Sequence, residues 1–220
     1  MMLIGLTGSI GMGKSTIANR FRSFNIPVFN SDEIVHDLYE SEAVKLIESA
    51  FPETIRNAKV DRDLLSQELM ANDNGFEKLQ SIVYPLVYKR KYDFVNRQFK
   101  SGSKMVVLEV PLLFETNCDA KCDVNLVVSA SYNIQKARVL QRNKMSVFKF
   151  QQIISRQFSD DEKKRRADFI VDTGQSIYNS YAQVDSIIQS LKIRNGIAYN
   201  LFWNPEVKQS FTHTFNFSEL

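Results

Sequence analysis

Residues 8–15 read GSIGMGKS, and four of the eight glycines of this 220-residue chain lie within its first 13 residues. The stretch fits the pattern G-x-x-x-x-G-K-[ST], with an apolar run at residues 2–7 before it and a helical pattern at residues 14–24 after it. Glycines let successive backbone N–H groups point into one concavity, and the following helix adds the positive end of its dipole. The stretch therefore predicts a polyphosphate-binding loop between a buried strand and a helix.

The residue types in this loop predict how a nucleoside triphosphate is held. The Lys14 ammonium can reach the β- and γ-phosphates, and the Ser15 hydroxyl can bind Mg²⁺. We therefore expect ATP as the nucleotide and Mg²⁺ as the cofactor. The residues expected to bind the ATP phosphates are Gly8, Gly11, Met12, Gly13, Lys14, Ser15 and Thr16. The loop alone does not indicate what the nucleotide is used for.

The rest of the chain alternates short apolar runs with helical patterns. Further strands are predicted at residues 27–30, 104–109, 124–129 and 169–172. Uniformly apolar strands separated by helices are typical of a parallel sheet covered on both faces. We predict an α/β protein with the three-layer P-loop NTPase fold, in which helices flank a five-stranded parallel sheet.

Two segments interrupt this alternation. Residues 33–100 have a helical pattern, including a segment at 74–99 with Pro85, a residue that can kink a helix. Residues 138–166 hold nine Lys and Arg against three acidic residues, a net charge of +6. We interpret the first as a helical substrate-binding insertion and the second as a basic lid.

Composition limits the classes of function. Lys and Arg number 28 against 25 Asp and Glu, a net charge of +3, which is too balanced for a protein held on nucleic acid by a basic surface. No stretch has the length of a membrane span, and the first residues do not form a secretory signal. Cys118 and Cys122 have no histidine nearby and make a poor metal site. We expect a cytoplasmic protein, a monomer or weak homo-oligomer, with no nucleic-acid or membrane partner.

The motifs that are missing narrow the class further. GTP-binding switches need N-K-x-D and D-x-x-G, and here Asn143-Lys144 is followed by Met145-Ser146. A kinase of small molecules must exclude water to avoid hydrolysing ATP, and mobile insertions that close over the substrates do this. We therefore interpret residues 1–193 as a P-loop kinase domain, followed by an aromatic-rich extension at 194–220.

Over about residues 2–193 the chain resembles the dephospho-coenzyme A kinase family. The resemblance rests on these stretches: IGLTGSIGMGKST from residue 4, VFNSDEIVH from 28, VDRDLL from 60, EVPLLFE from 109, the Q-x-x-R-x-x-x-R run at 135–142, RQ at 156–157 and ADFIVDTG at 167–174. It implies transfer of the γ-phosphoryl of ATP to the ribose 3′-hydroxyl of dephospho-CoA, the last step of CoA biosynthesis. Four positions depart from the family pattern: Asn30, Tyr84, Glu109 and Thr173.

The same resemblance suggests roles for residues outside the loop. Asp32 follows the second strand, at the sheet edge where ligands bind, and is implied to face the 3′-hydroxyl and orient it. The insertion is implied to hold the acceptor, so Arg62 is a candidate for its pyrophosphate. Glu109 ends an apolar strand, as acids near the Mg²⁺ water shell do in P-loop enzymes. The catalytic set is then Asp32, Lys14 and Arg142.

Other polar residues have both structural and functional interpretations. Arg138 and Arg142 are four apart in a predicted helix, so they share a face that can bind phosphate. Lys163–Arg166 is more typical of a solvated helix end. Ser31 can cap the helix that begins there.

The extension carries six aromatic residues and alternates apolar with polar residues at 211–217, which would suit a strand. It is expected to pack on the chain's own core or on a partner.

Three other functions stay open. The chain could be another P-loop kinase that acts on nucleotides or nucleosides. It could bind ATP without catalysis, because Asn30 replaces an acidic residue of the family. It could be a nucleic-acid-linked ATPase that uses residues 138–166. The near-neutral total charge argues against this third function.

Overall fold

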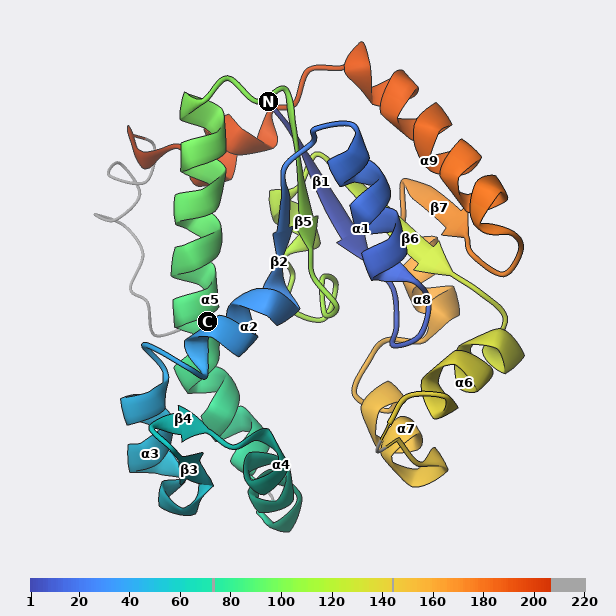
Figure 1. Ribbon diagram of the computed structural model, residues 1–220. Coiled ribbons are helices and arrows are strands. Elements are labelled where there is room, and N and C mark those ends of the chain that lie inside the picture. The colour runs from blue at the N-terminus through green and yellow to red at the C-terminus, as the bar shows by residue number, and fades with distance from the viewer. Residues whose placement is uncertain (73, 144, 207–220) are drawn as a thin grey trace. The chain divides into compact units, whose positions relative to one another are not determined.

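The computed structural model describes residues 1–72, 74–143 and 145–206 (Figure 1). Its main sheet has five strands: β1 (Met2–Thr7), β2 (Val28–Asn30), β5 (Met105–Glu109), β6 (Val124–Ser129) and β7 (Phe169–Asp172). The order is β2-β5-β1-β6-β7, and β1 pairs in parallel with both β5 and β6. Every residue of β1 is buried, as a strand covered on both faces requires. The predicted five-stranded parallel sheet is confirmed, and each strand begins within one residue of its predicted start.

Two helices cover one face of this sheet. Figure 1 shows α1 (Lys14–Ser23) beside α9 (Ile177–Lys192), and Ile17, Phe21, Val184 and Ile188 pack from them onto the strands. The short turn η2 (Asp119–Lys121) precedes β6, and the remaining helical elements after β6 are α6 (Tyr132–Leu140), α7 (Val147–Ile154), α8 (Asp160–Arg165) and the short η3 (Tyr199–Trp203).

The chain divides into two compact units. The first is Met1–Phe29 with the chain from Val95 onward, and the second is Asn30–Phe94. The second contains α2 (Ser31–Leu38), α3 (Val44–Ala50), η1 (Pro52–Thr54), β3 (Ile55–Arg56), β4 (Lys59–Val60), α4 (Arg62–Ala71) and most of α5 (Gly75–Lys100). It has its own core, in which Leu38, Ile47, Phe51, Leu65 and Leu69 are buried.

The second unit is not wholly helical, contrary to the prediction. β3 and β4 pair antiparallel, Ile55 opposite Val60 and Arg56 opposite Lys59. Asn57 and Ala58 make the turn with positive φ angles of 50° and 58°. Two-residue strands are too short to produce a period-two pattern, and this turn lacks the usual glycine, so no local pattern indicates a hairpin. Helix α5 continues through Pro85 without a break.

The start of α2 differs from the prediction by one residue. Asn30, not Ser31, is the N-cap: its Oδ1 accepts hydrogen bonds from the N–H groups of Asp32 at 2.9 Å and Glu33 at 3.3 Å. The Asn30 amide also donates to Glu33 Oε1 at 3.0 Å. Ser31 is the first helical residue and is buried. Asn30, at a position where the family pattern has an acidic residue, is therefore a helix cap. Asn and Asp fill such a position about equally well.

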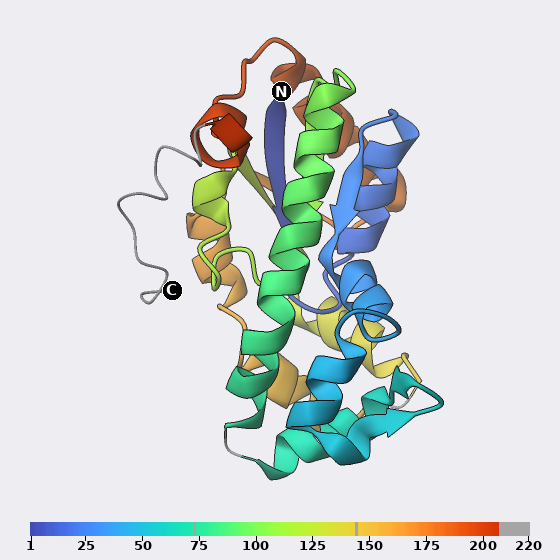
Figure 2. The same cartoon turned by 90° about the vertical axis from the view of Figure 1, so that its left-hand side faces the viewer.

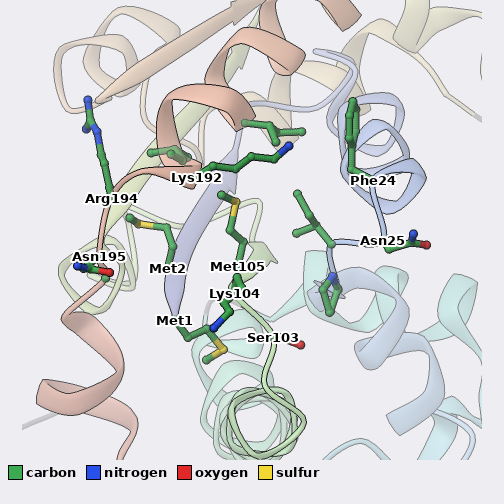
Figure 3. A pocket seen from close by; sticks show the side chains of 15 residues that line it. Met1, Met2, Phe24, Asn25, Ser103, Lys104, Met105, Lys192, Arg194 and Asn195 are labelled. Carbon is green, nitrogen blue, oxygen red and sulfur yellow. The ribbon is translucent and has the colours of Figure 1, made fainter.

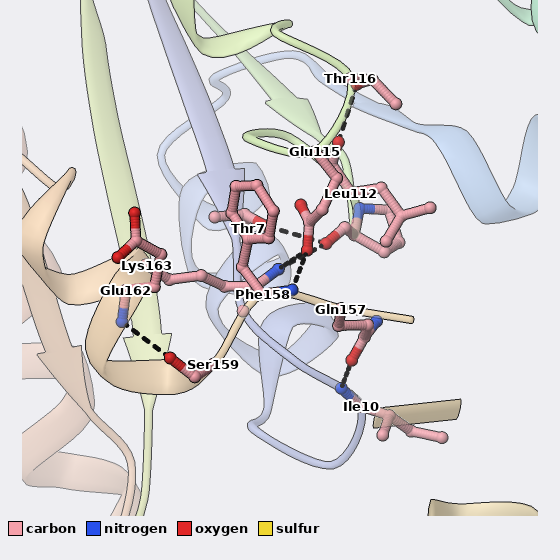
Figure 4. Close-up of polar contacts among 12 residues, drawn as sticks. Thr7, Ile10, Leu112, Glu115, Thr116, Gln157, Phe158, Ser159, Glu162 and Lys163 are labelled. Carbon is pink, nitrogen blue, oxygen red and sulfur yellow. Dashed lines mark hydrogen bonds and ion pairs between the residues drawn. The ribbon is translucent and has the colours of Figure 1, made fainter. Parts of the chain in front are cut away.

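The first residue of the run Lys163–Arg166 is buried, contrary to the expectation of a solvated helix end. Lys163 is fully buried, and its Nζ lies 2.9 Å from Glu115 Oε1 and donates to the Pro111 carbonyl at 3.0 Å (Figure 4). Ser159 does cap α8 by accepting from the Glu162 N–H, as the sequence predicted. The burial of Lys163 could not be foreseen because its partner lies far away in the sequence.

The described part of the extension packs on the first unit. Trp203 is fully buried and donates from its indole N–H to the Lys121 carbonyl, while the Tyr199 ring stacks on Phe99 at 3.7 Å between centroids. Figure 2 shows this segment beside the C-terminal end of α5. Of the two open alternatives, packing on the chain's own core is confirmed for these residues. The expected strand at 211–217 lies outside the described residues.

No helix in the described part of the chain is both long enough and apolar enough to span a bilayer.

Candidate active site

The phosphate loop connects the central strand directly to α1. Gly13 is the N-cap of α1 with φ 93°, a left-handed conformation that favours glycine, and it offers no side chain to cap the helix. In the described structure, therefore, no capping side chain occupies the first-turn N–H groups, which is the arrangement that binds phosphate. The Lys14 side chain folds back over the loop, and its Nζ donates to the Gly8 carbonyl at 2.7 Å. Ser15 and Thr16 are exposed in this first turn.

Arg138 reaches the back of this loop through Thr173. The guanidinium donates to the Thr173 carbonyl at 2.6 Å and to its hydroxyl oxygen at 3.2 Å. The Thr173 hydroxyl donates in turn to the Met12 carbonyl at 2.7 Å. Arg138 is thus joined to the loop by protein contacts, and the threonine at a position that departs from the family pattern makes the connection.

Glu109 lies beside the start of the loop. It is the last residue of β5, pairs in register with Leu6 of β1, and is 2% exposed. Since β1 and β5 are parallel, the Glu109 carboxylate is at the same sheet edge as the phosphate loop. Within the described residues no cluster of three His, Cys, Asp or Glu could hold a metal ion by protein ligands alone.

Arg142 lies outside the helix that carries Arg138. Helix α6 ends at Leu140, and Arg142 follows in a turn in which its N–H donates to the Val139 carbonyl. The prediction that the two arginines share one helical face is therefore wrong. Arg142 is exposed, whereas Arg138 is bonded to Thr173.

Three basic residues at the end of the lid region are paired within α8 and its C-cap. Lys164 lies 2.9 Å from Asp160 and 3.0 Å from Asp161, and both Arg165 and Arg166 bond to Glu162. Both bonds lower the pKa of the Glu162 carboxyl, and the bond from Arg165 has the larger effect. The three acidic residues of α8 are those already subtracted in the net charge of +6, so α8 itself is nearly balanced and the excess positive charge lies elsewhere in residues 138–166.

Asp32 and Arg62 both lie in the second unit. Asp32 is exposed in the first turn of α2, two residues after the end of β2, and Arg62 is exposed as the first residue of α4. The pKa of Tyr39 is raised by burial, and the positive charge of Arg62 opposes that rise. Arg62 is thus near the Tyr39 phenol and open to solvent.

Two cavities lie at opposite edges of the sheet. One of about 670 Å³ is at the amino ends of the strands, lined by Met1, Met2, Lys104 and Lys192 among others (Figure 3). The other, of about 680 Å³, adjoins Ser9 and Met12 of the phosphate loop. Ligands of open α/β folds bind at the carboxyl edge, so the first cavity is not the nucleotide site.

A strand, phosphate loop and helix at the centre of a five-stranded parallel sheet, with a separate inserted unit, define a P-loop kinase. Comparison with known proteins gives the particular family: the dephospho-CoA kinase family model matches residues 2–179, and the chain belongs to that family.

Curated relatives agree. The dephospho-CoA kinase of Rhizobium etli is 49% identical over 194 residues, covering 88% of this chain and 96% of that protein. The one from Agrobacterium fabrum is 45% identical over 87% of this chain and 98% of its own length. Among solved structures, TT1252 from Thermus thermophilus superposes with a TM-score of 0.76 at 25% identity, covering 86% of this chain and 96% of that one.

Proposed function

We propose that this protein transfers the γ-phosphoryl group of ATP to the ribose 3′-hydroxyl of dephospho-CoA, giving CoA and ADP. The observation that carries the proposal is an intact phosphate loop, with an uncapped helix behind it, in a member of the dephospho-CoA kinase family. Phosphoryl transfer depends mainly on positioning and on neutralising charge, and this loop can do both.

The residues at the loop fit Mg²⁺. Magnesium in P-loop enzymes takes one or two protein oxygens, with phosphates and water completing an octahedron. Ser15 would supply its exposed hydroxyl, and the buried Glu109 carboxylate would hold water of the metal shell. When bound, the ion neutralises charge on the phosphates.

Separate tasks are assigned to the side chains around the reacting group. Lys14 and Arg142 neutralise charge on the transferring phosphoryl group. Asp32 orients the acceptor hydroxyl, since a carboxylate is a much weaker base than an alkoxide and accepts the hydroxyl proton late. Arg62 binds the pyrophosphate of the acceptor. Arg138 supports the loop through Thr173 and contributes positive charge beside it.

The alternative of a protein that binds ATP without catalysis rests on Asn30, which stands in place of an acidic residue of the family. Asn30 serves as the N-cap of α2. Its side chain has a structural task that requires no carboxylate. We further infer that ATP and dephospho-CoA are the partners, that the location is cytoplasmic, and that the protein is a monomer or weak homo-oligomer.

The experiment that tests the function is product analysis with the purified protein, ATP, Mg²⁺ and dephospho-CoA. We expect equal amounts of ADP and CoA, and little product with a panel of nucleoside monophosphates and nucleosides. The Lys14→Ala variant serves as the inactive control. Preferential phosphorylation of a nucleotide or nucleoside, or ATP binding without product, would overturn the proposal.

A further inference from the structure

Both backbone groups of Ile10, in the phosphate loop, are hydrogen-bonded to glutamine side chains. The Ile10 carbonyl accepts from Gln135 Nε2 at 2.8 Å, and the Ile10 N–H donates to Gln157 Oε1 at 3.2 Å (Figure 4 shows the second contact). A backbone N–H can only donate and a carbonyl can only accept. The two side-chain amides are therefore used with opposite polarity, one as donor and one as acceptor.

The two glutamines flank the part of the chain that carries the lid arginines: Gln135 lies shortly before the lid region at 138–166, and Gln157 lies within it. Gln135 is on α6, and Gln157 is in the turn between α7 and α8. The chain between them carries Arg138 and Arg142. Both ends of this segment thus contact one residue of the phosphate loop.

Each end is held in place by further contacts. The N–H of Phe158, next to Gln157, donates to Glu115 Oε1 at 2.7 Å, the same oxygen that pairs with buried Lys163 (Figure 4). Gln135 is 5% exposed. A Cβ placed on Gly11 would lie 2.5 Å from Val139 and 3.0 Å from the Gln135 carbonyl, so α6 packs directly against the loop. The glutamines are therefore presented to Ile10 by a preorganised frame.

Away from these contacts, the lid is not packed tightly on the loop. The cavity of about 680 Å³ separates Ser9 and Met12 from Gln151, Ile154 and other residues of α7 and α8. The lid therefore has room to move, and its attachment to the loop depends on the contacts of the two glutamines.

We propose that Gln135 and Gln157 are positioning residues that couple the lid to the phosphate loop, so that a triphosphate in the loop fixes where the lid holds Arg142. This inference rests on the proposed kinase function. The bonds act through the Ile10 peptide and not on the substrate, so neither glutamine is catalytic.

The polarity of the two bonds gives a test that a general packing role would not pass. Glutamate at position 157 keeps an acceptor for the Ile10 N–H, while glutamate at position 135 faces the Ile10 carbonyl with a second acceptor. We expect Gln157→Glu to stay within about threefold of the native kcat/KM for ATP. Gln135→Glu, Gln135→Leu and Gln157→Leu should each lose about tenfold, the size of one hydrogen bond. Gln141→Leu, which alters an exposed glutamine between Gln135 and Gln157 that does not line this cavity, is the matched control and should retain native activity.

Two further readouts separate positioning from stability. ADP formed without acceptor, as a fraction of transfer to acceptor, should rise in the leucine variants, because a detached lid admits water. The double variant Gln135→Leu/Gln157→Leu should lose less than the product of the two single losses, because both side chains hold one segment. Equal effects of glutamate at both positions, or full activity per folded molecule in both leucine variants, would overturn the proposal.

The affinity for ATP, measured by titration calorimetry, keeps this test separate from the proposed function. If the native protein does not phosphorylate dephospho-CoA, the kinase proposal fails. The same variants still test the coupling through their dissociation constants for ATP. Gln135→Glu, Gln135→Leu and Gln157→Leu should raise this constant, and Gln157→Glu should leave it near the native value. An order of these constants that ignores the donor and acceptor roles would refute the coupling even in an active kinase.

Discussion

Lys163 and Glu115 form an ion pair, 2.9 Å from Nζ to Oε1, in which the lysine side chain is fully buried and the glutamate side chain is 12% exposed. The pair joins α8 to the segment after β5, and Lys163 also donates to the Pro111 carbonyl. Thr7, the last residue of β1, donates from its hydroxyl to the same carbonyl at 3.1 Å. One buried cation therefore connects the end of the lid region to the strand that leads into the phosphate loop.

Breaking this pair should be costly. Lys163→Met leaves the Glu115 carboxylate without its cation in a nearly dry site, and we expect the free energy of unfolding to fall by about 3–5 kcal/mol. Urea unfolding followed by circular dichroism measures the change. Lys164→Met, which removes a half-exposed lysine from the same helix, should cost less than about 1 kcal/mol. The double variant Lys163→Met/Glu115→Leu should recover most of the loss, and similar losses for Lys163→Met and Lys164→Met would contradict the assignment.

Arg142 and Arg138 should give different kinetic effects, because only Arg138 is bonded to Thr173. Arg142→Ala should lower kcat about 10²-fold and raise the KM for ATP by less, as expected for a charge that acts on the transferring group. Arg138→Ala should raise the dissociation constant for ATP and lower the unfolding temperature, because it removes two bonds behind the loop. Steady-state kinetics and thermal unfolding of both variants make the comparison. An unchanged kcat in Arg142→Ala would exclude its role.

The sequence predicted the fold more completely than the site. The strands and the phosphate loop have local signals: an apolar run of the right length, glycines at fixed spacing and a helix directly after them. The boundaries of β1, β6 and β7 were accordingly predicted to the residue.

The contacts that organise the site connect residues far apart in the sequence, and no periodic pattern reports them. Ile10 and Gln157 are 147 positions apart, and Lys163 and Pro111 are 52 apart. The residue types did carry a weak signal in one case, since Asn30 is as good a helix cap as Ser31 and precedes it. The end of α6 at Leu140 could not be read from the sequence, because the helical pattern continues through Arg142.

Asp32→Asn should separate catalysis from ATP binding. The amide cannot accept the hydroxyl proton, so we expect kcat to fall roughly 10²–10⁴-fold while the dissociation constant for ATP stays near the native value. Because Asn30 caps α2, the helix should remain folded in the variant. Glu33→Gln, which alters the neighbouring acid in the same turn, is the control and should affect kcat little. Native turnover in Asp32→Asn would remove this residue from the mechanism.

Arg20 and Asp185 should make stability depend on acid pH. The Arg20 guanidinium bonds to both oxygens of Asp185, at 2.7 and 2.5 Å, and joins α1 to α9. The hydrogen bond from Arg20 lowers the pKa of Asp185 below its usual 3.8. A carboxyl whose folded pKa is depressed stabilises the protein fully above its unfolded pKa and loses this contribution as the pH falls through the folded pKa. The native protein should therefore exceed Asp185→Asn in unfolding temperature at pH 6 by a small margin, which narrows as the pH falls below the usual 3.8 of the carboxyl. A margin that stays constant down to the lowest pH at which the protein is folded would show that the ion pair is not its source.

The extension after α9 should contribute stability, since its described part completes the core at the amino edge of the sheet. Asp123 accepts hydrogen bonds from the N–H groups of Leu3, Ile197 and Ala198, which joins the extension to β1. Trp203 is fully buried, so Trp203→Ala should lower the free energy of unfolding by about 3–5 kcal/mol, the usual cost of removing a large aromatic core side chain.

Truncation after Arg194 should destabilise the protein at least as much as Trp203→Ala, because it also removes Tyr199 from its stack on Phe99. The kinase constants per folded molecule should change less than threefold in both variants, because these contacts lie at the opposite sheet edge from the phosphate loop. Phe202→Ala, which alters an exposed aromatic residue in the same turn, should cost less than about 1 kcal/mol. A truncated protein with native stability would show that the first unit folds without the extension.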